Sequence, residues 1–276
     1  MPTLMELRSR PHWSFSSLYG LLSICSLQWR FQKIDKLKPK HTSVNLVAGS
    51  CYHRTLEQVY LALQNGKTFS TDDALEFYTE DWRRSSANEN IKYGKLDADS
   101  IEAQGRGLIG VAMENIDPSE DVLSVSEAFC VPIIHQGEFL TKPLLGEYDL
   151  TVRDKDGHPV VVDFKTSATR YSQKKVETSL QMSAYHYAYT VSKGVEPSLR
   201  FDVAVKNKTP VFETHVTERD KDDWALLGAL VAKAETLVEN SIFFPNRDSF
   251  ACNDCGFKAQ CAAWCHECPS AEKMAA

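Results

Sequence analysis

Two aspartates and a lysine lie within one short stretch in the middle of the chain, and their side chains suit the binding of a divalent cation. Asp149 closes the tetrapeptide 146–149, and Asp163 and Lys165 lie two residues apart in the apolar segment 160–165. Carboxylate oxygens are the ligands that Mg²⁺ and Mn²⁺ prefer, and residues two apart on a strand point to the same face. The lysine would therefore lie beside the ion, where it could orient and help to deprotonate an attacking water. This set of residue types predicts metal-dependent hydrolysis of a phosphodiester bond.

A β-hairpin would bring the two aspartates together. Strand-like segments at 148–153 and 158–165 flank Asp-Lys-Asp-Gly at 154–157, a sequence typical of a hairpin turn. If the last three residues of that tetrapeptide form the loop, antiparallel pairing places Asp149 opposite Asp163, with Cβ atoms about 5 Å apart. Two like charges at this separation repel each other unless a cation offsets them. A lone Asp-x-Lys is common on solvated strands, so the prediction rests on the surrounding residues rather than on the tripeptide.

Six sequence blocks around these residues follow one another in a characteristic order. They are 13–18 followed by Cys25, 49–53, 125–129, 146–149, 163–166 and 181–185. In this order the chain resembles the RecB-like branch of the PD-(D/E)XK nucleases, which includes the RecB and AddB nuclease domains and the CRISPR-associated iron–sulfur exonucleases. Ser26 departs from the family pattern, because many relatives carry proline after the first cysteine. The resemblance covers most of the chain and implies a restriction-endonuclease-like core.

The resemblance assigns roles to particular residues. It implies metal ligands at His53, Asp149, Asp163 and the backbone carbonyl of Phe164, and a catalytic set of Asp149, Asp163, Lys165, Glu127, Gln181 and Tyr185. Gln181 and Tyr185 lie four residues apart, so on a helix they share one face and could position the lysine or the DNA backbone. The same spacing also suits an ordinary helix face. Without the resemblance His53 would be interpreted as structural, whereas as a ligand its imidazole suits Mn²⁺ better than Mg²⁺.

Eight cysteines form a second group of candidate ligands, and five of them lie in the last 25 residues. They are Cys25, Cys51, Cys130, Cys252, Cys255, Cys261, Cys265 and Cys268. The N-terminus has no apolar run typical of a signal peptide, and no segment approaches the roughly 20 apolar residues of a membrane span. We therefore expect a reducing, cytoplasmic setting in a prokaryotic or phage-infected cell, without disulfides. We expect Cys51 and Cys130, which have apolar neighbours in the sequence, to be small buried residues.

Two metal–thiolate arrangements remain open for the other cysteines. The resemblance implies a 4Fe–4S cluster that joins the two ends of the chain and whose ligands are Cys25, Cys252, Cys255 and Cys261. A local Zn²⁺ site would instead use two Cys-x-x-Cys pairs, Cys252 with Cys255 and Cys265 with Cys268. Thiolates accept either metal, so spacing alone does not choose between the two.

The composition is that of a soluble globular protein. Over 276 residues, 43% are hydrophobic and 25% are charged, which is enough for a sizeable core without repeats. We expect a single domain over 1–276, with a helical N-terminal part at 13–120, a catalytic sheet core at 121–220, and a C-terminal helix and cysteine cluster at 221–268. The net charge of −6 argues against a broadly basic surface, so contacts to DNA must be local. The basic segments that could supply them are 33–40, 165–175 and 206–208.

Periodicity and turn residues predict the elements that position these side chains. Apolar spacing and Ser, Thr or Asp starts predict helices at 14–32, 50–65, 71–85, 172–191 and 221–239. Runs rich in β-branched and aromatic residues predict strands at 125–134, 148–153, 159–165, 198–205 and, with a weaker pattern, 211–216. The expected fold is α/β, with a mixed sheet flanked by helices.

These observations predict a metal-dependent DNA nuclease, an exonuclease on single-stranded ends that serves recombination, repair or CRISPR adaptation. A phosphate-binding loop is excluded at Gly66-Lys67-Thr68, because Leu61 stands where that motif needs glycine. Without a motor of its own, the chain would be either a stand-alone nuclease or a subunit that works with a helicase, recombinase or integrase partner, and no membrane partner is expected. The alternative from a different class is a non-catalytic iron–sulfur module that binds DNA and regulates a partner nuclease or integrase.

Overall fold

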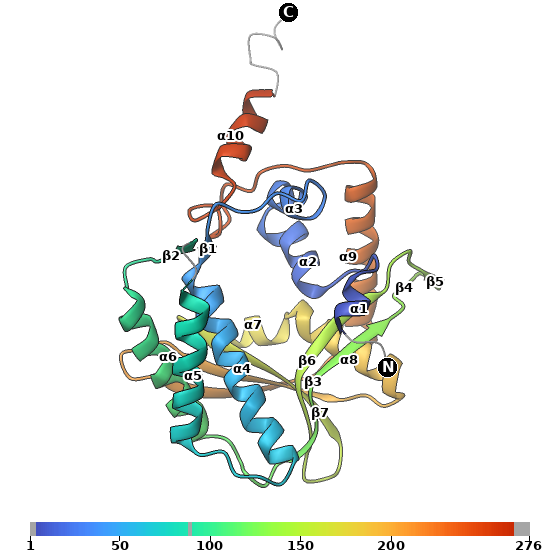
Figure 1. Ribbon diagram of the computed structural model, residues 1–276. Coiled ribbons are helices and arrows are strands. Elements are labelled where there is room, and N and C mark those ends of the chain that lie inside the picture. The colour runs from blue at the N-terminus through green and yellow to red at the C-terminus, as the bar shows by residue number, and fades with distance from the viewer. Residues whose placement is uncertain (1–3, 88–89, 268–276) are drawn as a thin grey trace, which may run out of the picture.

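The centre of the molecule is a mixed β-sheet with helices on both faces. The computed structural model describes residues 4–87 and 90–267. Within these residues the sheet has five strands in the order β3-β6-β7-β8-β9, of which β7 and β8 are parallel and the other neighbours are antiparallel. The strands are β3 (Asp121–Val131), β6 (Leu144–Arg153), β7 (Pro159–Ser167), β8 (Ser198–Val205) and β9 (Val211–Thr217). The predicted α/β fold is confirmed (Figure 1).

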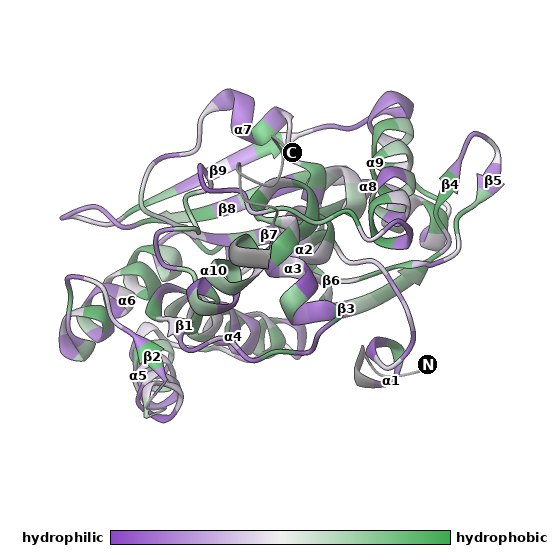
Figure 2. Ribbon diagram, turned by 90° about the horizontal axis from the view of Figure 1, so that it is seen from above, coloured by the Kyte–Doolittle hydropathy of each residue, from purple (hydrophilic) through white to green (hydrophobic). Residues whose placement is uncertain are grey.

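A hydrophobic core lies on each face of this sheet. The helices of the first face are α4 (Val44–Gln64), α5 (Thr71–Ser86) and α6 (Ala98–Met113), and those of the second are α2 (Phe15–Tyr19), α3 (Ser26–Lys33), α8 (Leu180–Lys193) and α9 (Lys221–Glu239). Along β7, Val160 and Val162 pack in the first core and Val161 packs in the second. Both faces of β7 are therefore buried, which explains its unbroken apolar run. Seen from above, hydrophobic residues concentrate in the strands between the two helical layers (Figure 2).

The predicted hairpin between β6 and β7 is confirmed. Arg153 pairs with Pro159, and the amide of Asp154 donates to the carbonyl of His158 at 2.9 Å, so the loop consists of residues 155–157. The carboxylate of Asp154 accepts the amides of Asp156 and His158 at 2.9 and 2.8 Å, and Gly157 adopts a φ of +85°. Local hydrogen bonding by aspartate and a glycine with positive φ thus set the register of the hairpin.

The prediction of one continuous helix over 14–32 is wrong. The structure has α2, then a π-helical turn η1 (Gly20–Ile24), then α3 (Ser26–Lys33). Cys25 between them is extended, with φ −170° and ψ 113°, and its sulfur accepts the amide of Gln28 at 3.4 Å. Ser26 exchanges two hydrogen bonds with the backbone of Phe244, at 2.9 and 3.0 Å. These contacts to a segment more than 200 residues away break the helix, and apolar spacing could not reveal them.

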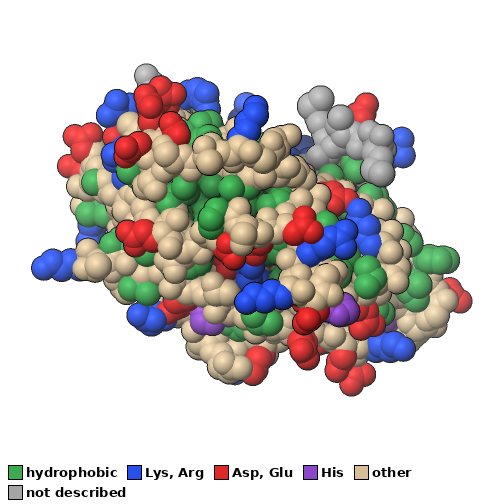
Figure 3. Space-filling view, turned by 90° about the horizontal axis from the view of Figure 1, so that it is seen from below, with side chains coloured by type: hydrophobic (Ala, Val, Ile, Leu, Met, Phe, Trp, Pro, Cys, Tyr) green, Lys and Arg blue, Asp and Glu red, His purple; other side chains and the backbone are tan. Residues whose placement is uncertain are grey.

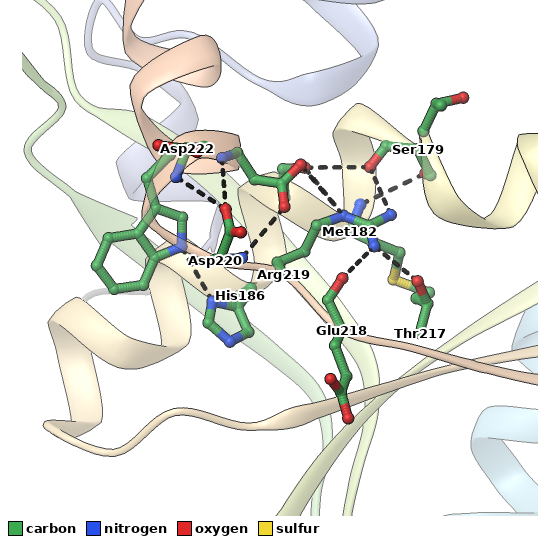
Figure 4. Close-up of polar contacts among 12 residues, drawn as sticks. Ser179, Met182, His186, Thr217, Glu218, Arg219, Asp220 and Asp222 are labelled. Carbon is green, nitrogen blue, oxygen red and sulfur yellow. Dashed lines mark hydrogen bonds and ion pairs between the residues drawn. The ribbon is translucent and has the colours of Figure 1, made fainter.

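A second predicted helix, 172–191, is also divided in two. Its parts are α7 (Gln173–Glu177) and α8, and Ser172 and Ser179 each cap the start of one of them. The buried guanidinium of Arg219 fills the break, where it donates to the carbonyls of Val176 at 2.9 Å and Ser179 at 3.3 Å (Figure 4). Arg219 also donates to the hydroxyls of Ser183 and Thr217, so it fixes the start of α8 against the end of β9.

Several elements were not expected from the sequence. They are α1 (Leu4–Arg8), β1 (Thr42–Ser43), β2 (Ile91–Lys92), α6, the β4 (Ile134–His135) and β5 (Glu138–Phe139) hairpin, and α10 (Lys258–Glu267). Helix α6 escaped prediction because three glycines interrupt its apolar pattern. One of them, Gly105, is required by packing, since a Cβ there would lie 1.7 Å from the hydroxyl of Tyr78.

The loop before α10 contacts the two residues that precede β1 and the end of β2. The amide of Lys40 donates to the carbonyl of Gly256 at 3.0 Å, and Asp254 pairs with His41 and Lys92. β1 and β2 pair in parallel beside these contacts. None of the described helices is both long and apolar enough to cross a membrane.

Candidate active site

The two candidate carboxylates lie where β6 and β7 separate. Pairing of the strands ends at Leu150 and Val162, one pair before the predicted opposition of Asp149 and Asp163. Beyond this pair, the amide of Phe164 donates to Oδ2 of Asp149 at 2.8 Å, so a side-chain oxygen takes the place of a backbone carbonyl as its acceptor. The hairpin register therefore brings both aspartates to one place, and the separation of the strands opens space beside them.

The alternation of side chains reverses at Asp149. Tyr148 packs in the core beneath α8, whereas Leu150, two residues later, packs in the core beneath α4. On β3, the position between the partners of Tyr148 and Leu150 is occupied by Ser126, which has a φ of +51°. A residue other than glycine in this conformation costs about 1–3 kcal/mol, and such strain collects at functional sites. The reversal leaves Asp149 between the two faces of the sheet.

The glycine of the Gly-x-x-Asp block is explained by close packing. A Cβ at Gly146 would lie 2.4 Å from the ring of Phe129. That ring stacks on Tyr148, with centroids 4.6 Å apart, and meets Tyr185 edge to face. The glycine thus lets an aromatic cluster support the strand that carries Asp149.

Two of the predicted residues contact Asp163 directly, and a third contacts it through one of them. It is 1% exposed, its Oδ1 accepts the amide nitrogen of Gln181 at 2.8 Å, and its Oδ2 lies 2.6 Å from the ammonium of Lys165. Gln181 also donates to the hydroxyl of Tyr185 at 3.0 Å, as expected for residues four apart on a helix. The ammonium of Lys165 neutralises the charge of Oδ2, and within the described residues this oxygen has no other hydrogen-bond partner.

His53 approaches the same site from α4. Its Nδ1 lies 3.3 Å from Oδ2 of Asp149, and its ring meets the ring of Phe164 edge to face. Phe164 in turn stacks on Tyr60 in the core beneath α4. The structure thus brings His53 and the two aspartates together from three separate elements.

The two carboxylates differ in their readiness to ionise. Burial raises the pKa of Asp163 to about 6, and the charge of Asp149 adds to this effect while that of Lys165 opposes it. Burial also disfavours ionised Asp149, but the hydrogen bond and charge of His53, together with Lys165, outweigh it and lower its pKa. Two acids that resist joint ionisation form a site in which a bound cation would favour the doubly charged form.

Glu127 is the register partner of Tyr148, one residue from Asp149, but its carboxylate forms an ion pair with a residue outside the candidate catalytic set. Its side chain pairs with Lys193 in the last turn of α8, with 2.5 Å between Oε1 and Nζ. Gln181 is twelve residues earlier on the same helix, which corresponds to about 18 Å. The resemblance alone supplied this prediction. Beside Glu127, Ser126 has a φ of +51°, and the strand changes faces there, since Val125 packs against one core and Phe129 lies in the other.

Two cavities flank the carboxylates. The first, of about 670 Å³, is lined by His53, Asp149, Phe164 and Lys165. The second, of about 500 Å³, is lined by Gln181 and Tyr185 of α8, by residues of β3 and β6, and by residues of the N-terminal segment. Arg8 and Glu147 line both cavities, so the two hollows meet at these residues. Sequence reasoning missed both: Glu147 lies inside the Gly-x-x-Asp block, and Arg8 belongs to no pattern.

A third cavity, of about 380 Å³, lies between the two ends of the described chain. Five cysteines line it, namely Cys25, Cys252, Cys255, Cys261 and Cys265. Backbone amides point at two of the sulfurs, since Asn246 donates to Cys25 and Phe257 donates to Cys255, both at 3.4 Å. Cys268 lies outside the described residues.

Two further observations concern candidate ligands. Cys51 is buried as predicted, whereas Cys130 is exposed, because it alternates on β3 with the buried Phe129. Within residues 4–87 and 90–267, no three His, Cys, Asp or Glu side chains are already arranged to hold a metal ion.

Comparison with known proteins finds a family and solved structures that are similar to most of this chain. Residues 12–262 match the model of the PD-(D/E)XK nuclease superfamily. A solved structure from Eubacterium rectale, named "Putative exonuclease", superposes with a TM-score of 0.52 at 13% identity, over 88% of this chain and 87% of that chain. At this identity the likeness shows the fold alone. The structure of SSO0001 aligns over 90% of this chain and 93% of that chain at 14% identity, and its TM-score of 0.38 is too low to support an argument. No curated protein matches the sequence significantly.

Proposed function

The chain belongs to the PD-(D/E)XK nuclease superfamily, and we propose that it is a metal-dependent deoxyribonuclease that acts on single-stranded ends. The observation that carries this proposal is the buried Asp163, ion-paired with Lys165 and adjoined by Asp149. Burial of two neighbouring carboxylates costs stability unless a cation offsets them, so the arrangement has little use in a purely structural sheet.

The donor set suits Mg²⁺ or Mn²⁺. Asp149, Asp163 and the carbonyl of Phe164 would supply oxygen ligands, and His53 would add an imidazole. The buried Oδ2 of Asp163 has no hydrogen-bond partner besides the Lys165 ammonium within the described residues, and its remaining lone pair could bind such an ion. When bound, the cation would supply Lewis acidity for the phosphoryl oxygen.

The protein groups have separate tasks in this scheme. Lys165 faces the first cavity, where it would hold the attacking water and favour loss of its proton. The water oxygen bonds to phosphorus, the bond from phosphorus to the sugar oxygen breaks, and that oxygen takes a proton. Gln181 fixes the orientation of Asp163, and the amide of Phe164 fixes that of Asp149.

We further propose that the cysteine cavity holds a 4Fe–4S cluster, as in the RecB-like branch. Support comes from the convergence of Cys25 with Cys252, Cys255 and Cys261 across more than 200 residues, and from the amides directed at the sulfurs. Hydrogen bonds to cysteine sulfur are characteristic of such sites. A Zn²⁺ site that uses Cys265 remains the competing assignment, and metal analysis after anaerobic purification separates the two.

We also propose that the nuclease serves DNA processing, either alone or together with a partner protein. A helicase, recombinase or integrase would present the strand in recombination, repair or CRISPR adaptation.

Cleavage of end-labelled DNA tests the proposal. Wild type, Lys165→Ala and the distant surface variant Lys233→Ala are each incubated with 5′- and 3′-labelled single strands and duplexes in Mg²⁺ or Mn²⁺. We expect Lys165→Ala to lose activity by about 100-fold or more, as for removal of a group that assists proton transfer, and Lys233→Ala to match wild type. Equal activity of Lys165→Ala and wild type would contradict the mechanism. Absence of cleavage by a folded, metal-loaded wild type would favour the non-catalytic module.

A further inference from the structure

We propose that the second cavity, between the N-terminal segment and α8, is a subsite that holds an unpaired nucleotide next to the scissile phosphate. This inference rests on the proposed nuclease function and specifies how the enzyme would select single strands. The residues that carry it are Phe15, Arg8 and Lys33, none of which belongs to the candidate catalytic set.

The second cavity lies next to the candidate catalytic residues. Gln181 and Tyr185 line its wall, and Gln181 is hydrogen-bonded to Asp163 at 2.8 Å. At Arg8 and Glu147 it meets the first cavity, which contains Asp149 and Lys165. A strand whose phosphate lies at the carboxylates would therefore place a neighbouring nucleotide here. The volume of about 500 Å³ falls within the range of small-molecule sites and is large enough for a nucleotide.

The charges lining the cavity suit a phosphate chain. Arg8 and Lys33 are exposed, and Lys33 forms no ion pair with any of the residues that the structure describes. His12 lines the same cavity. Glu147 also lines the cavity and opposes these cations, but the two basic side chains outnumber it. The cations are local rather than part of a basic coat: acidic and basic groups are interspersed over the face shown in Figure 3, and the net charge is −6.

An aromatic ring provides a surface for a base. Phe15 lines the cavity and stacks on Tyr19, one turn later, with centroids 5.6 Å apart and an interplanar angle of 22°. Tyr19 is 40% exposed, so the stacked pair is not part of the closed core. Grooves for single strands combine cations along the backbone with aromatic rings that stack on bases. A duplex has no unpaired base to offer, so a site of this kind selects an unpaired strand.

Binding without cleavage tests the inference independently of the nuclease activity. Fluorescence anisotropy of a labelled oligothymidine and of a blunt duplex is measured with the full chain carrying Lys165→Ala, so that the probe stays intact. Phe15→Ala is added to remove the ring, Phe15→Leu to keep its apolar volume, and Phe15→Tyr to keep stacking. Phe139→Ala, at a 72% exposed position on β5, is the matched control.

We expect Phe15→Ala and Phe15→Leu to weaken binding of the single strand by at least about fivefold, which corresponds to the loss of one stacked base. Phe15→Tyr and Phe139→Ala should bind as the parent does, and duplex affinity should change little. Arg8→Ala and Lys33→Ala should each reduce the slope of log K against log salt by about 0.7, whereas Lys233→Ala should leave it unchanged.

The outcomes separate this inference from the proposed function. If Phe15→Ala and Phe15→Leu bind the single strand normally, or if they weaken duplex binding equally, the subsite is refuted even where wild type cleaves DNA. If wild type never cleaves but Phe15→Ala and Phe15→Leu lose single-strand binding while Phe15→Tyr keeps it, the subsite stands and the catalytic assignment falls.

Discussion

Two glycines of one helix should respond to the same substitution with opposite signs. In α6, a Cβ at Gly105 would lie 1.7 Å from the hydroxyl and 2.1 Å from Cζ of the fully buried Tyr78, whereas a Cβ at Gly110 would meet nothing within 4 Å. Replacing a helical glycine by alanine gains about 1 kcal/mol, because alanine loses less conformational freedom on folding. Gly110→Ala should therefore raise the free energy of unfolding by about 0.5–1 kcal/mol.

At Gly105 the same gain is outweighed by overpacking. Extra volume in a closed core costs about 1–3 kcal/mol, and a ring that must retreat by more than 1 Å lies at the upper end of that range. We expect Gly105→Ala to lower the free energy of unfolding by about 2 kcal/mol, measured by urea denaturation followed by circular dichroism. Tyr78→Phe removes the nearest clashing atom, and its hydroxyl has no hydrogen-bond partner within the described residues. The double variant should therefore recover part of the loss. A Gly105→Ala protein as stable as Gly110→Ala would refute the packing argument.

Three further predictions test the framework around the site. Arg219→Met should lower the free energy of unfolding, measured by urea denaturation, by about 2–5 kcal/mol, because buried carbonyls lose their donor. Arg153→Met breaks only an exposed ion pair and should lower it by less than about 1 kcal/mol. Similar losses for the two variants would contradict the role given to Arg219. Burial disfavours ionised Asp81, but hydrogen bonds from two arginines outweigh it and lower its pKa, so its stabilising contribution exists above about pH 4 and fades as the pH falls. Asp81→Asn should therefore lower the free energy of unfolding by about 2 kcal/mol at pH 7 and by little at pH 3. A loss that is independent of pH would show that the charge of Asp81 is not its source. Cys255→Ala should lose bound iron, visible absorbance and thermal stability, with Cys130→Ala as the exposed control; stoichiometric zinc in colourless wild type would contradict the cluster.

The sequence predicted those elements whose structure depends on local pattern. Strand β8 and helix α9 have the predicted bounds, because an apolar run and an Asp220 capping box mark them within their own residues. The hairpin loop at 155–157 was predictable for the same reason, since Asp154 bonds only to its neighbours. Where one helix was predicted and two are present, residues far away in the sequence cause the break. The amide of Phe244 donates to Ser26, and Arg219 donates to the carbonyl of Ser179 at the start of α8. No pattern within a short window contains such contacts.

The residues of the candidate site also differ in whether local spacing was enough to predict their positions. The spacing of Asp149, Asp163 and Lys165 follows from one hairpin, so counting residues was enough to place them together. Glu127 could not be placed in this way, because alternation along a strand holds only while every residue is extended. Ser126 leaves the extended region, and the reversal of the faces at Asp149 accompanies it. The positive φ of Ser126 thus lies where the side-chain alternation fails, and a strained residue of this kind beside a carboxylate supports a functional hypothesis that the regular strand around it does not.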